Sequence, residues 1–204
     1  MVQRAFGPSS HRSRAGMPHL IRVRCERYGN CRAPSARRMG QSYDARNPDF
    51  SRFAAHGGKL FLIHGWSDMV LPPEVTIDYY ERVQAKMAPQ IAASFVRIYV
   101  VPGMEHGFAG PGPNAFGQGI PPSMTAEPSS NISAALDTWV EKGVASDAIV
   151  ARKYDGDFKA LIVPNEMTPK RTRPLCPYPQ VARWMSMGSS DDAKNLRCVA
   201  PPSP

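Results

Sequence analysis

Residues 59–110 read KLFLIHGWSDMVLPPEVTIDYYERVQAKMAPQIAASFVRIYVVPGMEHGFAG and decide the fold. The runs 60–63 and 95–101 are apolar apart from Arg97 and predict two strands, because a strand covered on both faces shows no apolar-polar alternation. Between the runs, apolar residues recur every fourth position and predict one face of a helix: Val75, Tyr79, Val83 and Met87. Parallel strands need such a crossover, so the stretch predicts a βαβ unit of an α/β sheet.

An acid and a histidine follow the two predicted strands. Asp68 comes after a tight turn, and His106 lies between Gly103 and Gly107. In open α/β sheets, catalytic groups gather beyond the carboxyl ends of the strands. A carboxylate there can orient an imidazole, which can act as general base and then as general acid. The order acid, helix, strand, base therefore predicts the last two members of a hydrolytic triad, within hydrogen-bond reach of each other.

Plainer roles stay open for these residues. An Asp in such a turn can serve only to form the turn, and a histidine in a glycine loop can be a hydrogen-bonded surface residue. His64, at the exit of the first strand, is expected to brace the Asp68 turn by a hydrogen bond. A direct role of His64 in proton transfer is the second alternative.

Four long stretches match a known family. They are HGGKLFLIHGWSDMVLPPEVTIDYYERV (56–83), FVRIYVVPGMEHGFAGPGPNAFG (95–117), ALDTWVEKGVASDAIVA (135–151), and TRPLCPYPQVARW (172–184) continued to Cys198. Over about residues 44–198 the chain resembles the tannase and feruloyl esterase family of serine hydrolases. The resemblance implies a carboxylic ester hydrolase acting on small esters of aromatic acids, such as galloyl or feruloyl esters.

The resemblance also implies roles for single residues. Asp68 would be the acid and His106 the base of a Ser-Asp-His triad, and Cys176 would form a disulfide with Cys198. The loop 103–119 would be the rim of the site, where Phe108 and Phe116 are candidate substrate-rim residues; His64, at the exit of the first strand, is a third candidate. For the two phenylalanines the alternative is that they anchor the loop to the core. No cofactor and no metal are expected.

The expected fold class is α/β: a partial α/β-hydrolase fold, consisting of its C-terminal strands and helices, with a loop-rich, disulfide-stapled C-terminal segment. Residues 44–204 would form this C-terminal part of the domain. Before the last of its helices, Ser130 or Asn131 is a predicted cap, and Lys142-Gly143 ends that helix. A structural disulfide is typical of oxidising compartments, so the parent family is expected to be secreted or periplasmic.

Two departures from the family pattern concern the chemistry. Gly107 stands where the family has a cysteine directly after the catalytic histidine, and no Gly-x-Ser-x-Gly occurs in the chain. The nearest match, residues 65–69, lacks the last glycine. Only the acid and base of the triad are therefore expected here, and the chain alone is expected to be inactive. The alternative is a catalytically inactive fragment or an aromatic-acid-binding remnant.

The basic charge belongs to one end of the chain. The formal net charge is +8, and residues 1–46 hold ten arginines against two acids, which accounts for all of it. The hydrolase-like part is thus neutral, and we expect it to bind no nucleic acid. Residues 1–43 are expected to be a disordered or non-family segment, with a transit peptide or phosphate-binding arm as alternatives. No apolar run of about 18 residues occurs, so no membrane association is expected.

Overall fold

The computed structural model describes residues 45–118, 127–162 and 166–201. The chain divides into two compact units, residues 1–47 and 48–204, and every helix and strand named below lies in the second. The basic segment predicted over residues 1–43 lies outside the described residues. No helix in the described ranges has the length and apolar character needed to cross a membrane.

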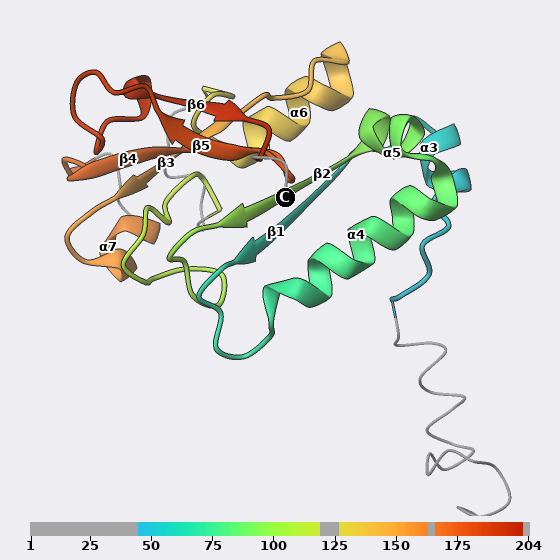
Figure 1. Cartoon of the computed structure of the whole chain (residues 1–204), viewed down its shortest axis with the longest axis horizontal. Helices are drawn as coiled ribbons and strands as arrows, with labels where there is room; N and C mark the ends of the chain where they lie inside the picture. The colour runs from blue at the N-terminus through green and yellow to red at the C-terminus, as the bar shows by residue number, and fades with distance from the viewer. Residues whose placement is uncertain (1–44, 119–126, 163–165, 202–204) are drawn as a thin grey trace, which may run out of the picture. The chain divides into compact units, whose positions relative to one another are not determined.

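Two parallel strands lie at the centre of the second unit (Figure 1). β1 (Leu60–Gly65) pairs with β2 (Val96–Val101) residue for residue, from Leu60 opposite Val96 to Gly65 opposite Val101. Among the described residues, β1 has no second strand neighbour. The chain passes from one strand to the other through helices, so the predicted βαβ unit is confirmed.

The crossover consists of two helices that each begin with a proline. A short helix, α3 (Ser51–Ala55), precedes β1, and α4 (Pro73–Met87) and α5 (Pro89–Phe95) follow it. A proline in the first helical turn costs no hydrogen bond, because the amide there has no partner within the helix. The prediction that Phe95 opens the second strand is wrong. Phe95 ends α5, and its burial is equally compatible with a helix end or a strand start.

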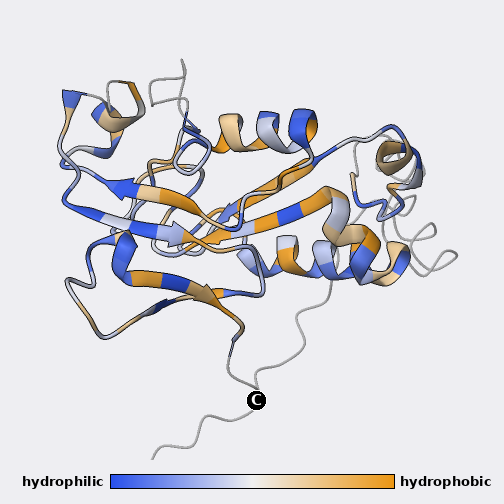
Figure 2. Ribbon diagram, turned by 90° about the horizontal axis from the view of Figure 1, so that it is seen from above, coloured by the Kyte–Doolittle hydropathy of each residue, from blue (hydrophilic) through white to orange (hydrophobic). Residues whose placement is uncertain are grey.

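The buried face of α4 is narrower than the predicted one. The helices mix hydrophilic and hydrophobic residues along their length (Figure 2), and α4 buries Tyr80 and Val83 against the sheet. Val75, placed on the same face by sequence, is 59% exposed. Four residues turn a helix by more than one full turn, so a row of every fourth residue drifts away from the core.

The C-terminal segment contains more strands than the sequence predicted. β3 (Ile149–Lys153) pairs antiparallel with β4 (Arg171–Leu175), and β5 (Val181–Trp184) with β6 (Leu196–Val199). Helix α7 (Asp157–Ile162) and the 3₁₀ turn η2 (Ala193–Asn195) lie between these strands. The segment is therefore less loop-rich than predicted. Its strands carry arginines and a proline in place of an apolar pattern, and their pairing is set by residues distant in sequence.

The disulfide predicted from the family resemblance is confirmed. Cys176 directly follows β4, Cys198 lies in β6, and their Cα atoms are 5.5 Å apart, within the range that a disulfide spans. Tyr178, just beyond this bridge, donates its backbone N–H to Ile98 O of β2 at 2.8 Å. The C-terminal segment therefore covers the edge of β2 that faces away from β1.

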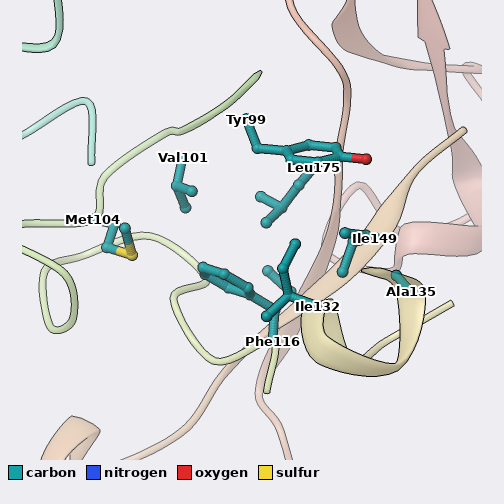
Figure 3. Close-up of a cluster of buried hydrophobic side chains, with 9 residues drawn as sticks. Tyr99, Val101, Met104, Phe116, Ile132, Ala135, Ile149 and Leu175 are labelled. Carbon is teal, nitrogen blue, oxygen red and sulfur yellow. The ribbon is translucent and has the colours of Figure 1, made fainter. Parts of the chain in front are cut away.

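The core between β2, β3, β4 and α6 (Ile132–Lys142) is drawn in Figure 3. It contains nine buried side chains: Tyr99, Val101, Met104, Phe116, Ile132, Ala135, Ile149, Ala151 and Leu175. The start and end of α6 agree with prediction. Asn131 accepts the N–H groups of Ser133 and Ala134, and Gly143 ends the helix in the left-handed region.

Candidate active site

The turns after β1 and β2 are bound to each other by backbone hydrogen bonds. Trp66 donates its N–H to Val101 O, and Ser67 donates to Met104 O, both at 2.9 Å. A Cβ atom on Gly65 would lie 2.1 Å from Glu105 O, so only glycine permits this approach. The predicted acid and base turns are thereby held side by side at the carboxyl ends of the strands.

The Asp68 carboxylate is almost fully enclosed and accepts hydrogen bonds on both oxygens. Its side chain is 4% exposed. Oδ1 accepts the N–H groups of Val70 at 2.7 Å and Leu71 at 3.0 Å, and Oδ2 lies 2.8 Å from His106 Nδ1. Burial acts to raise the pKa of Asp68, but the hydrogen bonds from Leu71, His106 and Val70 outweigh it and lower the pKa to about 2. Asp68 is therefore an anion at neutral pH.

His106 lies at the tip of a tight turn closed by the Glu105 N–H to Ala109 O hydrogen bond at 3.2 Å. Its side chain is 60% exposed, and its 2.8 Å contact with Asp68 meets the predicted distance. Because Asp68 accepts at Nδ1, the ring presents Nε2 on its opposite side. Among the described residues, Nε2 has no hydrogen-bond partner, which leaves it available to a reacting group.

His64 braces the Asp68 turn, as predicted for this residue. Its Nε2 lies 3.0 Å from Leu71 O and 3.3 Å from Asp68 Oδ2, and its Nδ1 lies 2.6 Å from Thr76 Oγ1. With both nitrogens in contact and a side chain 10% exposed, His64 is more a support of the turn than an open rim residue.

The two candidate rim phenylalanines, Phe108 and Phe116, differ in how far they are buried. Phe116 is fully buried in the core of Figure 3, so the alternative in which it anchors the loop holds, and its rim assignment is corrected. Its neighbours are the apolar side chains of α6 and β3, which a mouth residue would not reach. Phe108 is partly exposed and meets Phe158 edge to face at 6.5 Å.

A polar cluster that sequence reasoning missed supports the loop behind His106. Lys153 donates to Gly110 O at 2.6 Å and contacts the carboxylate of Asp157. Asn114, which is buried, donates to Gly112 O and to Asp157 Oδ1, both at 3.1 Å. Lys153 and Asp157 are four residues apart, a spacing that brings side chains together within one helix. Here Lys153 ends a strand and Asp157 begins a helix, so the spacing alone did not predict their contact.

A cavity of about 880 Å³ adjoins the two site turns. Its lining includes Trp66, Gly103, Pro113, Arg173, Tyr178 and Val181, while Asp68 and His106 do not line it. In the described part of the chain, no three His, Cys, Asp or Glu side chains gather in a way that could hold a metal ion.

A parallel strand pair with an acid and a histidine beyond its carboxyl ends is the arrangement of α/β-hydrolases. The profile described as tannase and feruloyl esterase matches residues 20–199, so the matched range begins upstream of Asp44. This chain belongs to the tannase and feruloyl esterase family.

Individual relatives agree with this assignment. An uncharacterised esterase of Xanthomonas campestris pv. campestris is 42% identical over 172 residues, covering 78% of this chain and 29% of that protein. The mono(2-hydroxyethyl) terephthalate hydrolase of Piscinibacter sakaiensis is 38% identical over 160 residues, covering 78% and 23%. The crystal structure of feruloyl esterase B from Aspergillus oryzae superposes with a TM-score of 0.67 at 31% identity, covering 81% and 32%. The chain thus spans less than a third of each relative's length.

Proposed function

We propose that this chain supplies the acid and the base of a carboxylic ester hydrolase acting on esters of aromatic acids. The observation that carries the proposal is the 2.8 Å contact between Asp68 Oδ2 and His106 Nδ1, with Nε2 of the same ring unpartnered among the residues that the structure describes. The deep enclosure of Asp68 supports it, since an anion held at Oδ1 by backbone N–H groups can orient the imidazole through Oδ2.

The proposed reaction is acyl transfer through a serine ester. His106 Nε2 takes the proton of a serine hydroxyl as its oxygen attacks the ester carbonyl, and Asp68 stabilises the resulting imidazolium through Nδ1–H. His106 then returns the proton to the departing alcohol as the C–O ester bond breaks. Water, deprotonated by His106, releases the acid and restores the serine. No cofactor enters this sequence of steps.

The substrate class rests on the relatives. Two of them are named for feruloyl and terephthalate esters, and both acyl groups are aromatic. We extend to this chain the aromatic acid esters and, because Cys176 and Cys198 form a disulfide, an oxidising location outside the cytoplasm. Phe108, partly exposed in the His106 loop, is the candidate contact for an aromatic acyl group.

The test needs a nucleophile, and no Gly-x-Ser-x-Gly occurs in this chain. We therefore suggest a fusion protein in which the upstream part of the Xanthomonas relative precedes residues 44–204, assayed on methyl ferulate and methyl gallate. His106→Ala and Asp68→Asn should each lower kcat by roughly 10⁴-fold or more. His56→Ala is the matched control, because His56 is exposed and its ring, within the described part of the chain, hydrogen-bonds only to Arg52 O. Full activity of the His106→Ala protein would contradict the proposal.

Residues 1–204 alone should hydrolyse neither ester at enzymatic rates. An alternative function, binding of aromatic acids without turnover, is favoured by the cavity beside Trp66. Adding ferulate stepwise to the whole chain while its tryptophan fluorescence is recorded separates binding without turnover from hydrolysis. Saturable quenching that Trp66→Phe abolishes, together with a fusion protein that stays inactive, would favour the binding function.

A further inference from the structure

We propose that Thr76 and His64 are positioning residues for Asp68, forming a chain of contacts that runs from helix α4 through His64 to the Asp68–His106 pair. The structural part of this inference stands on contacts alone. Its consequence for catalysis rests on the function proposed above. Thr76 lies in the first turn of α4, which begins at Pro73, and this places its hydroxyl beside the end of β1.

The contacts of His64 determine where its ring hydrogen lies. Nε2 is 3.0 Å from Leu71 O, and a carbonyl oxygen can only accept, so Nε2 must carry the hydrogen. In the neutral ring Nδ1 is then an acceptor, and the Thr76 hydroxyl at 2.6 Å is its donor. Leu71 O thus sets the tautomer, and Thr76 supports it by donating to Nδ1, so that Nε2–H is presented to Leu71 O and to Asp68.

His64 restrains the oxygen of Asp68 that His106 uses. Oδ1 is held by the N–H groups of Val70 and Leu71, whereas Oδ2 contacts His106 at 2.8 Å and His64 Nε2 at 3.3 Å. His106 is largely exposed, whereas His64 is enclosed and in contact at both ring nitrogens. Without His64 the Asp68 carboxylate could rotate about Oδ1, and the His106 ring bonded to Oδ2 would then shift as well. His64 therefore does for Asp68 what Asp68 does for His106.

Helix α4 is a firm base for this chain of contacts. It packs on the sheet through Tyr80 and Val83, which are buried in the same cluster as β2 residues Val96 and Ile98. The position of the Thr76 hydroxyl is thus set by the core of the βαβ unit. A change at Thr76 should reach Asp68 through His64 without altering that core.

The experiment uses the whole chain and NMR. The ring nitrogens of His64 and the carboxyl carbon of Asp68 are followed by pH titration in the wild type, Thr76→Val, Thr76→Ser and His64→Phe proteins. Valine matches threonine in shape but has no hydroxyl, and serine keeps the hydroxyl. Thr138→Val on α6 is the matched control, since α6 covers the core cluster of Phe116 and not the Asp68 turn.

We expect the wild-type spectrum to show His64 with its hydrogen on Nε2. Thr76→Val removes the donor to Nδ1 and leaves the Leu71 O contact in place, so it should loosen the His64 ring without changing its tautomer and raise the midpoint of the Asp68 titration. His64→Phe should raise the midpoint further, and Thr76→Ser and Thr138→Val should resemble the wild type. Hydrogen on Nδ1 in the wild type, or an unchanged Asp68 midpoint in a folded Thr76→Val protein, would overturn the inference. If His64→Phe does not fold, Thr76→Val decides alone.

The same variants in the fusion protein test the catalytic consequence. Thr76→Val should lower kcat on the order of tenfold, the scale of losing a group that orients another, with KM unchanged and Thr76→Ser restoring the rate. A fusion protein that is inactive in every form would count against the proposed function, while the NMR result would still judge the positioning role. An unchanged kcat beside an altered Asp68 titration would refute the catalytic consequence.

Discussion

The two parallel strands have similar apolar sequences but very different surroundings. In β2, Val96, Ile98, Tyr99 and Val101 are all buried, while Ile63 of β1 is 37% exposed and its neighbours are half-buried. β2 has β1 on one edge and the backbone of Tyr178 on the other, whereas β1 has only β2 among the described residues. An apolar run thus predicts a strand, but the elements beside the strand decide how far it is buried.

The largest expected difference between the strands concerns stability. Ile98→Ala should lower the free energy of unfolding by about 3 kcal/mol, because it leaves a cavity in a packed core. Ile63→Ala, at an exposed position of the partner strand, should cost about 1 kcal/mol or less. Guanidinium unfolding of both variants with unchanged slopes measures the difference. Equal losses would show that β1 is as well covered in solution as β2.

Removing the cover of β2 should make the two strands more alike. The disulfide closes a loop with a sequence separation of 22, so Cys176→Ala with Cys198→Ala should cost about 3 kcal/mol, chiefly by freeing the unfolded chain. Hydrogen exchange at the Tyr178 amide, which bonds to Ile98, should become faster. A reductant should lower the unfolding midpoint of the wild type and leave that of the double variant unchanged. A slow Tyr178 amide in the double variant would mean that packing alone holds the cover.

The acid beyond β1 is enclosed, whereas the histidine beyond β2 is exposed. The ionisation of the enclosed Asp68 should make the stability of the fold depend on pH. The folded pKa of Asp68, about 2, lies below its usual value of 3.8, so ionised Asp68 stabilises the fold above about pH 4. This stabilisation should disappear as the pH falls towards 2. The wild type should therefore be more stable than Asp68→Asn at pH 6, with the gap closing by pH 2, in unfolding curves compared at each pH. A gap that does not change with pH would place the effect outside this ionisation.

The smallest expected effect concerns the open edge of β1. Ile63→Lys should change the free energy of unfolding by only about 0.5 kcal/mol, because the side chain already reaches solvent. A charge on a strand that, among the described residues, has one edge without a partner should nevertheless reduce aggregation, which light scattering during gentle heating would detect. Ile98→Lys is the matched comparison and should unfold the protein. More aggregation in Ile63→Lys than in the wild type would argue against the idea that chains aggregate through β1.

Local patterns were enough to predict the βαβ unit and the meeting of Asp68 with His106. The acid and the base each follow a strand within a few residues, and parallel strands bring such turns to the same edge of a sheet. The patterns could not distinguish the end of a helix from the start of a strand at Phe95, nor a core phenylalanine from a rim residue at Phe116. In each case the same apolar residue satisfies both environments.

The supports of the site could not be predicted, because their partners are distant in sequence. Thr76 meets His64 across the crossover, and Lys153 with Asp157 reaches the loop at Gly110 from β3 and α7. Their residue types are ordinary surface types, and the i, i+4 spacing of Lys153 and Asp157 does not reveal that they meet near Gly110. The strands β3, β4, β5 and β6 were missed for the same reason, since short strands of mixed polarity gain their structure from pairing.

The sequence by itself determined the class of the fold, the order of acid and base, and, through the family resemblance, the pairing of Cys176 with Cys198. These follow from local periodicity and from motifs that are contiguous in the chain. Only the tertiary structure decided that Asp68 is enclosed and held on both oxygens, that His106 is exposed, and that β2 is flanked on both edges while β1, within the described ranges, pairs only with β2. Burial and hydrogen bonding depend on which distant segments pack together, and a local pattern carries no information about that.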